Sequence, residues 1–487
     1  MAKGLGSVRR SVMALMLALA CAATPIAAAH AQIFMSAEQE KKIGAQEHPK
    51  ILQQYGGVYN ERDLDAYVAT IGGRIAANSN DPSMGYTITL LNSPVINAFA
   101  LPGGYVYITR GIIALANSEA EVAGVLGHEI GHVTAHHTAK RYDRAMATNI
   151  LGALAGILTG SQAVGQIAGL GGQAYLASFS REQEYQADEL GVIALARTGY
   201  DPYAQADFLN TMGLEMDLEA RLAGKDANRV DFFASHPNTP DRVRKAIEEA
   251  KGSGVPMASR PRRHDEYLSH INGMLYGDDP KEGFIRGRTF VHPGLGFKFT
   301  VPEGFTLQNT ASAVGATAKD GSLIIFDMGK SKSGANPSNY LVNEFAPEVK
   351  TRAGRVETFT ANGLSGATTL VQVQTQQGTR NLRMVAMAGA NNIMYRFLCV
   401  TPTNRTQAME GPFQKTVYSF NRLSSAERKT AKPLRVRVVT AGSGDTVASL
   451  AKRMQFDDYK VERFRAFNGL GANEAIKAGY KYKIIAE

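Results

Sequence analysis

A cluster of histidines between Val125 and Thr138 offers the clearest chemistry in the sequence. The stretch reads VLGHEIGHVTAHHT and holds four of the ten histidines in the chain. His128 and His132 lie four residues apart, and Glu129 directly follows the first. On a helix, residues i and i+4 lie one turn apart on the same face, so two imidazoles can reach one ion. The glutamate then points near an open coordination position, where it can take a proton from water.

A catalytic zinc ion needs three protein ligands and one open position, so the pattern predicts a third ligand elsewhere. We do not expect His136 to supply it, because three ligands along one straight helix cannot surround an ion tetrahedrally. The histidine that some zinc proteases carry six residues after the second ligand is absent, because Thr138 occupies that position. We expect His136 and His137 to be solvated or hydrogen-bonded.

An acidic helix further along the chain is a candidate source of the missing ligand. Ser180–Gly191 reads SREQEYQADELG, with Glu184 and Asp188 four residues apart on one face. One carboxylate could bind the metal, and the other could accept the free ring N–H of a liganding histidine. Taken alone, such a helix is a solvated acidic face. The nearby histidine pattern favours the metal site instead.

Four motifs, in this order along the chain, resemble those of the M48 family of zinc metallopeptidases, in its periplasmic, BepA-like branch. They are Asn97–Gly104 (NAFALPGG), His128–His132 (HEIGH), Glu184–Asp188 (EYQAD) and Ser235–Pro237 (SHP). The resemblance covers roughly residues 35–250. It implies a gluzincin site that holds one zinc ion per chain.

The resemblance also implies a role for each residue of the site. The zinc ligands would be His128, His132 and Glu184, with Glu129 as the general base. Peptide hydrolysis would follow from attack of an activated water on a carbonyl polarised by the metal.

Two further residues complete the implied catalytic set. Asp188 would orient a liganding histidine, which we expect to be His128, since a carboxylate bonded to a zinc ligand serves to orient it. His236 would lie near the zinc, where it could stabilise the oxyanion or, in a latent state, occupy the fourth position. The alternative for His236, a lone histidine before a proline, is an ordinary loop residue.

The implied function is a zinc metalloendopeptidase acting on misfolded or unassembled envelope proteins, outer-membrane proteins among them. Asn97–Leu101 or Tyr105–Thr109 could hold the substrate as an added β-strand. The alternative, from another class, is a cell-wall-tethered chaperone or scaffold with a latent zinc site. The presence of every chemical residue favours the enzyme. The sequence shows no internal period of about 34 residues, so it gives no sign of a helical-repeat domain.

The first residues are typical of a secretory signal peptide, which we assign to residues 1–31. Lys3, Arg9 and Arg10 form a basic segment before the apolar run Ser11–Ala20, which is too short to span a bilayer. Ala29–Ala31 then offers the small-x-small pattern of a cleavage site. An uncleaved anchor is the less favoured alternative.

Cysteine usage and charge indicate the bacterial periplasm. Cys21 follows the apolar run, but Ala18 stands where a lipidation motif prefers leucine, so a lipoprotein anchor is less favoured. Removal of residues 1–31 leaves only Cys399, and an exported chain without a disulfide fits that compartment. Removal of residues 1–31 also lowers the formal charge from +9 to +6, and this mildly basic charge could favour anionic envelope surfaces. The sequence has no dense basic run with interleaved aromatic residues, so we do not expect it to bind nucleic acid.

The expected fold class is α+β, in several domains. A mainly helical gluzincin-type domain with a small sheet would occupy residues 32–250, and a linker region residues 251–287. A sheet-rich accessory domain would follow over residues 288–422, because short β-type runs alternate there with Gly and Asn turns. The segment Ala145–Ser180 contains no charged residue. We expect it to form a packed helical hairpin that touches a membrane surface or covers the site, rather than a transmembrane span.

Residues 434–487 form a third unit with a β-α-α-β rhythm. Gly444–Thr446 (GDT) and Phe467–Leu470 (FNGL) resemble a LysM domain, a small module that binds the N-acetylglucosamine of peptidoglycan. The alternative is an accessory domain without sugar affinity. The helices expected elsewhere are Ser36–Gln54, Leu64–Ala77, Ser118–Lys140, Ser180–Thr198 and Asp241–Lys251.

Overall fold

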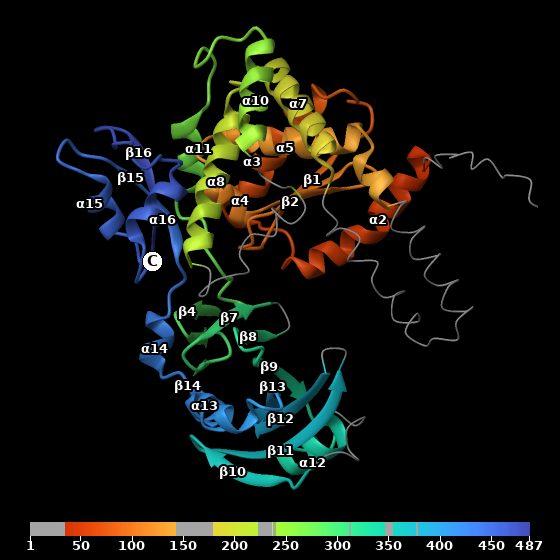
Figure 1. The fold of residues 1–487 in the computed structure, drawn as a ribbon, viewed down its shortest axis with the longest axis vertical. Helices are drawn as coiled ribbons and strands as arrows, with labels where there is room; N and C mark the ends of the chain where they lie inside the picture. The colour runs from red at the N-terminus through yellow and green to blue at the C-terminus, as the bar shows by residue number, and fades with distance from the viewer. Residues whose placement is uncertain are drawn as a thin grey trace, which may run out of the picture.

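The computed structural model describes residues 35–142, 179–222, 236, 240–310, 313–345, 354–375 and 378–487. The predicted signal peptide and nearly all of the charge-free segment Ala145–Ser180 lie outside these ranges. The fold is mixed, with helices and several sheets, as expected (Figure 1). None of the helices in the described ranges has both the length and the apolar character needed to cross a bilayer.

Helices surround a small sheet in the N-terminal half of the structure. The sheet has the order β1-β3-β2, with β1 parallel and β2 antiparallel to β3. The edge strand β2 packs against α5. The elements are α2 (Ala37–Gln54), η1 (Glu61–Asp63), α3 (Leu64–Ala77), β1 (Thr87–Leu91), β2 (Ala98–Leu101), β3 (Tyr105–Thr109), α4 (Arg110–Leu115), α5 (Glu119–Thr134), α7 (Arg181–Thr198), α8 (Ala204–Leu222) and α10 (Pro240–Gly252).

Side-chain caps explain where several of these helices begin. Ser36 and Ser180 each form a capping box with the glutamine three residues on, so α2 and α7 begin where the sequence predicts. Ser118 caps α5 by accepting from the backbone N–H of Glu121.

The prediction of one helix over Ser118–Lys140 is wrong at its C-terminal end. Helix α5 ends at Thr134, and a second helical segment covers residues 137–142. Between them His136 adopts a left-handed backbone conformation with φ of 53°. This conformation interrupts the i to i−4 ladder and redirects the chain.

Residues 284–422 form the expected sheet-rich part, which begins slightly before residue 288. Antiparallel pairing builds a seven-stranded sheet, β10-β11-β12-β13-β9-β8-β7, and a four-stranded sheet, β14-β6-β5-β4. The elements are β4 (Phe284–Arg286), β5 (Thr289–His292), β6 (Phe297–Thr300), β7 (Phe305–Asn309), β8 (Val314–Ala318), β9 (Leu323–Lys330), α12 (Pro337–Tyr340), η4 (Leu341–Phe345), β10 (Glu357–Ala361), β11 (Leu364–Thr375), β12 (Gly378–Ala388), η6 (Ala390–Asn392), β13 (Ile393–Pro402), α13 (Thr406–Ser419) and β14 (Asn421–Arg422).

Residues 251–287, which we expect to be a linker region, are partly helical. They contain α11 (His264–Ile271), whose Tyr267, Leu268 and Ile271 are buried. The apolar side of α11 joins the core shared by the N-terminal helices and the C-terminal unit, so burial overrides the loop-like composition around it. A further helix, α14 (Ser425–Thr430), precedes the C-terminal unit.

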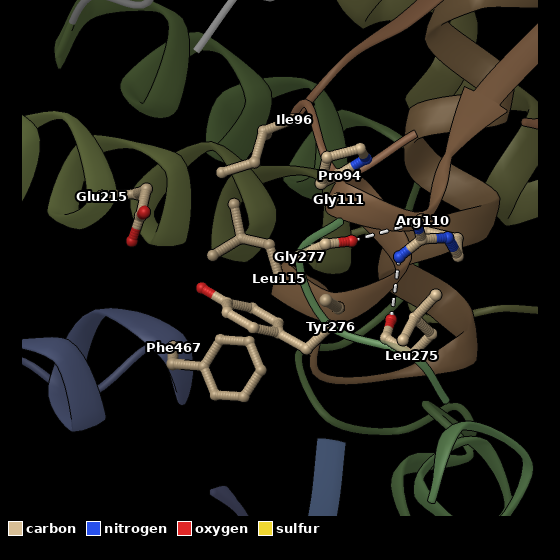
Figure 2. A pocket seen from close by; sticks show the side chains of 11 residues that line it. Pro94, Ile96, Arg110, Gly111, Leu115, Glu215, Leu275, Tyr276, Gly277 and Phe467 are labelled. Atoms are coloured by element: carbon tan, nitrogen blue, oxygen red, sulfur yellow. Dashed lines mark hydrogen bonds between the residues drawn. The ribbon is translucent and has the colours of Figure 1, made fainter. Parts of the chain in front are cut away.

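The C-terminal unit has the expected β-α-α-β order and packs beside α8 and α11 (Figure 1). Its strands form an antiparallel pair, which the segment 273–276 extends through Gly273 N–H donating to Val436 O and Tyr276 N–H to Leu434 O. Figure 2 shows a small cavity at this junction, where Arg110 donates to two backbone carbonyls. The elements are β15 (Arg435–Thr440), α15 (Val447–Lys452), α16 (Lys460–Phe467) and β16 (Lys481–Ala486).

A buried lysine fastens the C-terminal unit to the N-terminal half. Lys483 on β16 is fully buried, and its ammonium group donates to the carbonyls of Ala114, Leu115 and Ala116 at 2.6–2.8 Å. These carbonyls lie at the C-terminal end of α4, where they lack helical partners and the helix dipole favours a cation. The ammonium group also lies 4.4 Å from the ring centroid of Phe467.

We predict that Lys483→Met destabilises the protein by about 2–4 kcal/mol, because the buried carbonyls would lose their donor. Lys481→Met is the matched control, since Lys481 is partly exposed and pairs with Asp265 at 2.9 Å. Its exposed ion pair should contribute about 0–1 kcal/mol. Urea unfolding measures both variants, and equal stability of the two would show that the buried contact stabilises nothing.

Candidate metal centre

The metal-site residues come from two helices that approach each other unusually closely. A Cβ added at Gly191 on α7 would lie 3.1 Å from His128 N, and one at Gly127 on α5 would lie 3.2 Å from the Gly191 Cα. A Cβ at Gly131 would lie 3.0 Å from Ala187 O. Glycine therefore lets the two backbones touch. This contact brings side chains of α5 and α7 into one buried site.

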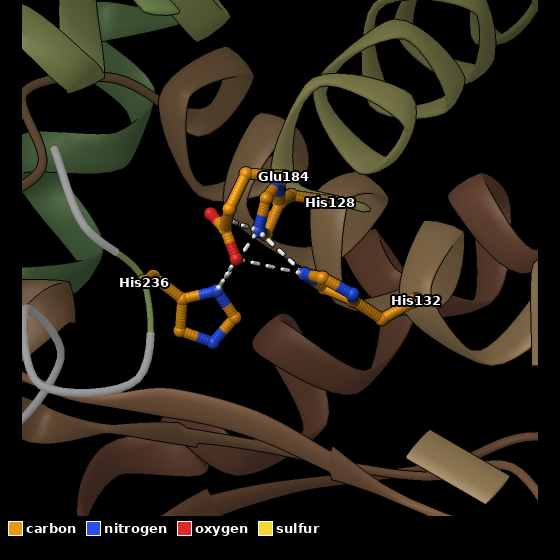
Figure 3. Close-up of side chains that lie close together, drawn as sticks. All are labelled: His128, His132, Glu184 and His236. Atoms are coloured by element: carbon orange, nitrogen blue, oxygen red, sulfur yellow. Dashed lines mark hydrogen bonds and ion pairs between the residues drawn. The ribbon is translucent and has the colours of Figure 1, made fainter. Parts of the chain in front are cut away.

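Four potential ligand atoms converge between these helices (Figure 3). They belong to His128, His132, Glu184 and His236, all buried, and lie within 4.8 Å of one another. His128 Nε2 lies 3.1 Å from His132 Nε2 and 3.2 Å from His236 Nδ1. Glu184 Oε1 lies 2.9 Å from His236 Nδ1 and 3.5 Å from His132 Nε2.

These separations fit a tetrahedral metal ion. With metal–ligand bonds of about 2.0–2.1 Å, tetrahedral ligand atoms lie about 3.3 Å apart. Two imidazole nitrogens at 3.1 Å, beside a third and a carboxylate, place several lone pairs together in a buried space. A cation would stabilise this arrangement, and three histidines with one carboxylate are the ligand types that zinc accepts.

Hydrogen-bond partners set the tautomers of the two helix histidines. Asp188 Oδ1 lies 2.9 Å from His128 Nδ1, so the ring proton is on Nδ1 and the Nε2 lone pair faces the centre. His132 Nδ1 lies 3.0 Å from His137 Nδ1, and His137 Nε2 lies 3.0 Å from Gln186 Oε1. Gln186 Oε1 accepts from the N–H of His137 Nε2, so His137 Nδ1 accepts from His132 Nδ1–H. His132 Nε2 is therefore unprotonated.

Glu129 lies beside this group, with its Oε1 3.6 Å from His236 Nε2. This oxygen is buried and accepts no hydrogen bond from any residue that the structure describes. An unpartnered buried carboxylate oxygen is costly, so its position indicates an external partner, such as water or a substrate group.

A buried arginine, which the sequence analysis did not single out, completes the site. Arg242 on α10 donates to Asp188 at 2.7 and 2.8 Å, and its Nη1 lies 2.6 Å from Glu184 Oε2 as an ion pair. Gln205 on α8 also donates to Asp188, at 3.1 Å. Glu184 thus faces Arg242 with one oxygen and the histidines with the other. A single arginine in a helical first turn carries no sequence signal of burial.

Burial and ion pairing fix the charges of the site. Burial raises the pKa of Asp188, but Arg242 and His128 outweigh it, so the value lies well below the usual range. Glu184 behaves likewise, with the pKa lowered by His236, His132 and Arg242 against burial. Both carboxylates are therefore anionic at neutral pH.

The histidines respond according to their partners. Burial lowers the pKa of His128, but Asp188 more than offsets it, so the pKa is raised. Burial lowers the pKa of His132, and that of His137 to about 4, so both rings are neutral at pH 7. Asp188 thus favours a proton on the Nδ1 of His128, and neutral His132 suits a metal ligand.

The structure separates the two neighbouring histidines, His136 and His137. His136 is half exposed and lies 3.2 Å from Glu40 of α2. His137 is buried against His132. Neither belongs to the group of four ligand atoms.

Comparisons with known proteins agree with this site. Residues 62–250 match the model for Peptidase family M48. The beta-barrel assembly-enhancing protease of Yersinia pestis is 35% identical over 198 residues, 38% of this chain and 39% of that protein. Its namesake in Escherichia coli (strain K12) is 30% identical over 227 residues, 44% of this chain and 45% of that one. The mitochondrial metalloendopeptidase OMA1 of Schizosaccharomyces pombe is 29% identical over 219 residues, 44% of this chain and 62% of that one.

The similarity covers only part of each protein. The chain spans about two fifths of the length of the bacterial relatives it matches. The matched residues 62–250 include the four residues of the candidate metal centre.

We predict that Gly191→Ala weakens zinc binding and costs about 1–3 kcal/mol of stability, because the new methyl group pushes α7 away from His128 N. Gly252→Ala at the end of α10 is the matched control, since a Cβ there meets nothing within 4 Å. Zinc titration and thermal unfolding measure both variants. Unchanged zinc affinity in Gly191→Ala would show that the close helix contact does not position the ligands.

Proposed function

Because residues 62–250 match peptidase family M48, we propose that the chain is a zinc-dependent endopeptidase. The observation that carries this proposal is the convergence of the ligand atoms of His128, His132 and Glu184, with Glu129 beside them. We assign the first three as zinc ligands and Glu129 as the general base. A bound zinc ion would act as a Lewis acid and lower the pKa of a water molecule towards neutrality.

The residues of the chain then divide the work of hydrolysis. Glu129 takes the proton of the attacking water and passes it to the leaving amine. Asp188 holds the His128 ring in the liganding tautomer, and Arg242 keeps Glu184 and Asp188 anionic and fixed in place. We assign Asp188 an orienting role rather than that of a proton donor, because its low pKa leaves it no proton at neutral pH.

We propose that the substrate adds as a strand to the β2 edge of the small sheet. Strand β2 (Ala98–Leu101) is the edge strand of the order β1-β3-β2 and packs against α5, which carries the site. Strand addition recognises backbone more than side chains. Such recognition suits misfolded or unassembled proteins, and the names of the bacterial relatives associate them with β-barrel assembly.

The position of His236 supports an additional latent state of the site. Its Nδ1 lies 3.2 Å from His128 Nε2 and 2.9 Å from Glu184 Oε1, where a fourth ligand would lie. Three other ligands leave one position for water, so a histidine there would exclude it. This observation also supports the alternative function, a chaperone or scaffold with a latent zinc site.

We place the protein in the bacterial periplasm and propose envelope proteins as substrates. The predicted signal peptide and the β-barrel assembly named for the bacterial relatives support this location. The β-α-α-β order of residues 434–487 supports a LysM-like domain, for which we propose peptidoglycan as a ligand. Contact with a membrane surface remains a prediction from the charge-free segment Ala145–Ser180.

We predict that Glu129→Gln lowers kcat/KM on unfolded casein by about 10²–10⁴-fold, because the base that takes the proton of water is lost. Zinc content should stay at one ion per chain, since the ligands are intact. The measurement compares zinc-quantified mature protein and variant, with chelator-treated wild type as the inactive reference. Wild-type cleavage by zinc-loaded Glu129→Gln would refute the base assignment, and absence of cleavage by zinc-loaded wild type would favour the latent scaffold.

We predict that His236→Ala raises the rate of casein cleavage without loss of zinc, because the fourth position becomes available to water. His264→Ala is the control histidine, since His264 lies away from the metal centre against the carbonyls of Asn117 and Lys481. Zinc content and initial rates measure both variants. A rate that falls in His236→Ala at full zinc content would assign the residue to oxyanion stabilisation instead.

A further inference from the structure

His137 is placed to control the second liganding histidine. It lies five residues after His132, and on a continuous helix its side chain would point about 140° away. The left-handed residue His136 ends α5 and turns the chain back, so that His137 Nδ1 comes within 3.0 Å of His132 Nδ1. A non-glycine residue in this conformation is strained, and the surrounding structure offsets the strain.

The environment leaves His132 and His137 little freedom. His132 is 0% exposed and His137 2% exposed. Phe179 stacks on the His132 ring with 3.8 Å between ring centroids. The His137 ring packs edge-on against the His132 ring, with 5.1 Å between centroids. On its far side, His137 Nε2 lies 3.0 Å from the side-chain oxygen of Gln186 on α7.

These hydrogen bonds determine which ring nitrogen of His132 carries the proton, and they add no charge to the site. Gln186 accepts the N–H of His137 Nε2, which leaves His137 Nδ1 as an acceptor for His132 Nδ1–H. The other liganding histidine, His128, is held by the carboxylate of Asp188 instead. A neutral imidazole orients His132 without adding a further anion to the buried carboxylates already present.

We propose that His137 is a positioning residue for the metal centre: it holds His132 in the tautomer whose Nε2 lone pair faces the ion. Gln186 sets the tautomer of His137 in turn. This inference rests on the proposed function, since it gives the group of ligand atoms a resident zinc ion. It assigns to His137 a role that its place within the predicted helix Ser118–Lys140 does not indicate.

Zinc affinity tests the proposal without a substrate. His137→Leu removes the acceptor while keeping an apolar side chain, and we expect the zinc dissociation constant to rise by about 10–100-fold. His137→Asn should recover most of the affinity, because its side-chain oxygen can take the place of Nδ1. The probe is Zn²⁺ competed against a chelating dye at fixed pH. Thermal unfolding of the metal-free proteins checks that each variant folds.

A neighbouring histidine provides the matched control. His136→Asn preserves the left-handed backbone, which asparagine tolerates, and removes only the contact with Glu40. Its zinc affinity should equal that of wild type. Wild-type affinity in His137→Leu would overturn the proposal, as would an equal loss in His137→Leu and His137→Asn, which would assign the effect to packing.

Two further readouts keep the test decisive. If His137→Leu does not fold, Gln186→Leu replaces it, and wild-type zinc affinity there would overturn the tautomer relay. Co²⁺ absorption should change its ligand-field bands in His137→Leu but not in His136→Asn. If zinc affinity depends on His137 but the chain cleaves no protein, this inference stands and the proposed peptidase function is refuted. If the chain cleaves protein but its zinc affinity does not depend on His137, the peptidase function stands and this inference is refuted.

Discussion

The close contact between α5 and α7 is the constraint on which the metal centre depends. Two histidines on α5 and a carboxylate on α7 meet here across helix backbones that nearly touch. Gly127 and Gly191 permit this, because any side chain at either position would meet the opposing backbone at about 3 Å. The remaining features of the site act on a geometry that these glycines set. Arg242, Asp188 and His137 orient the groups that the helix contact brings together.

Buried charge is the second constraint, and it explains why the site needs its outer residues. Glu129, Glu184 and Asp188 are all buried, and anions removed from water are costly unless cations compensate them. Arg242 compensates two of them through three short contacts. A divalent ion at the four converging ligand atoms would supply the remaining positive charge. The site is therefore electrostatically consistent with a bound metal ion.

Local signals in the sequence predict the elements of the N-terminal half and the spacing of the site. The helices expected over Ser36–Gln54, Leu64–Ala77 and Ser180–Thr198 match α2, α3 and α7 to within a residue. Local patterns do not predict long-range contacts, and none of them shows that Arg242 is buried against two carboxylates. The end of α5 was missed since His136 looks like any other helical residue. Burial of α11 against another unit likewise depends on residues far away in the sequence.

Helix α5 links the C-terminal unit to the metal centre through its two ends. At its start, Glu119 accepts from Tyr67 at 2.7 Å and Tyr200 at 2.5 Å. The loop just before it receives Lys483 from the C-terminal unit. At its other end it carries the liganding histidines. A helix fixed at its start keeps the ligands at its end in register, because the backbone ladder between them is stiff. The C-terminal unit therefore contributes to the scaffold that holds the site, whatever ligand its outer surface binds.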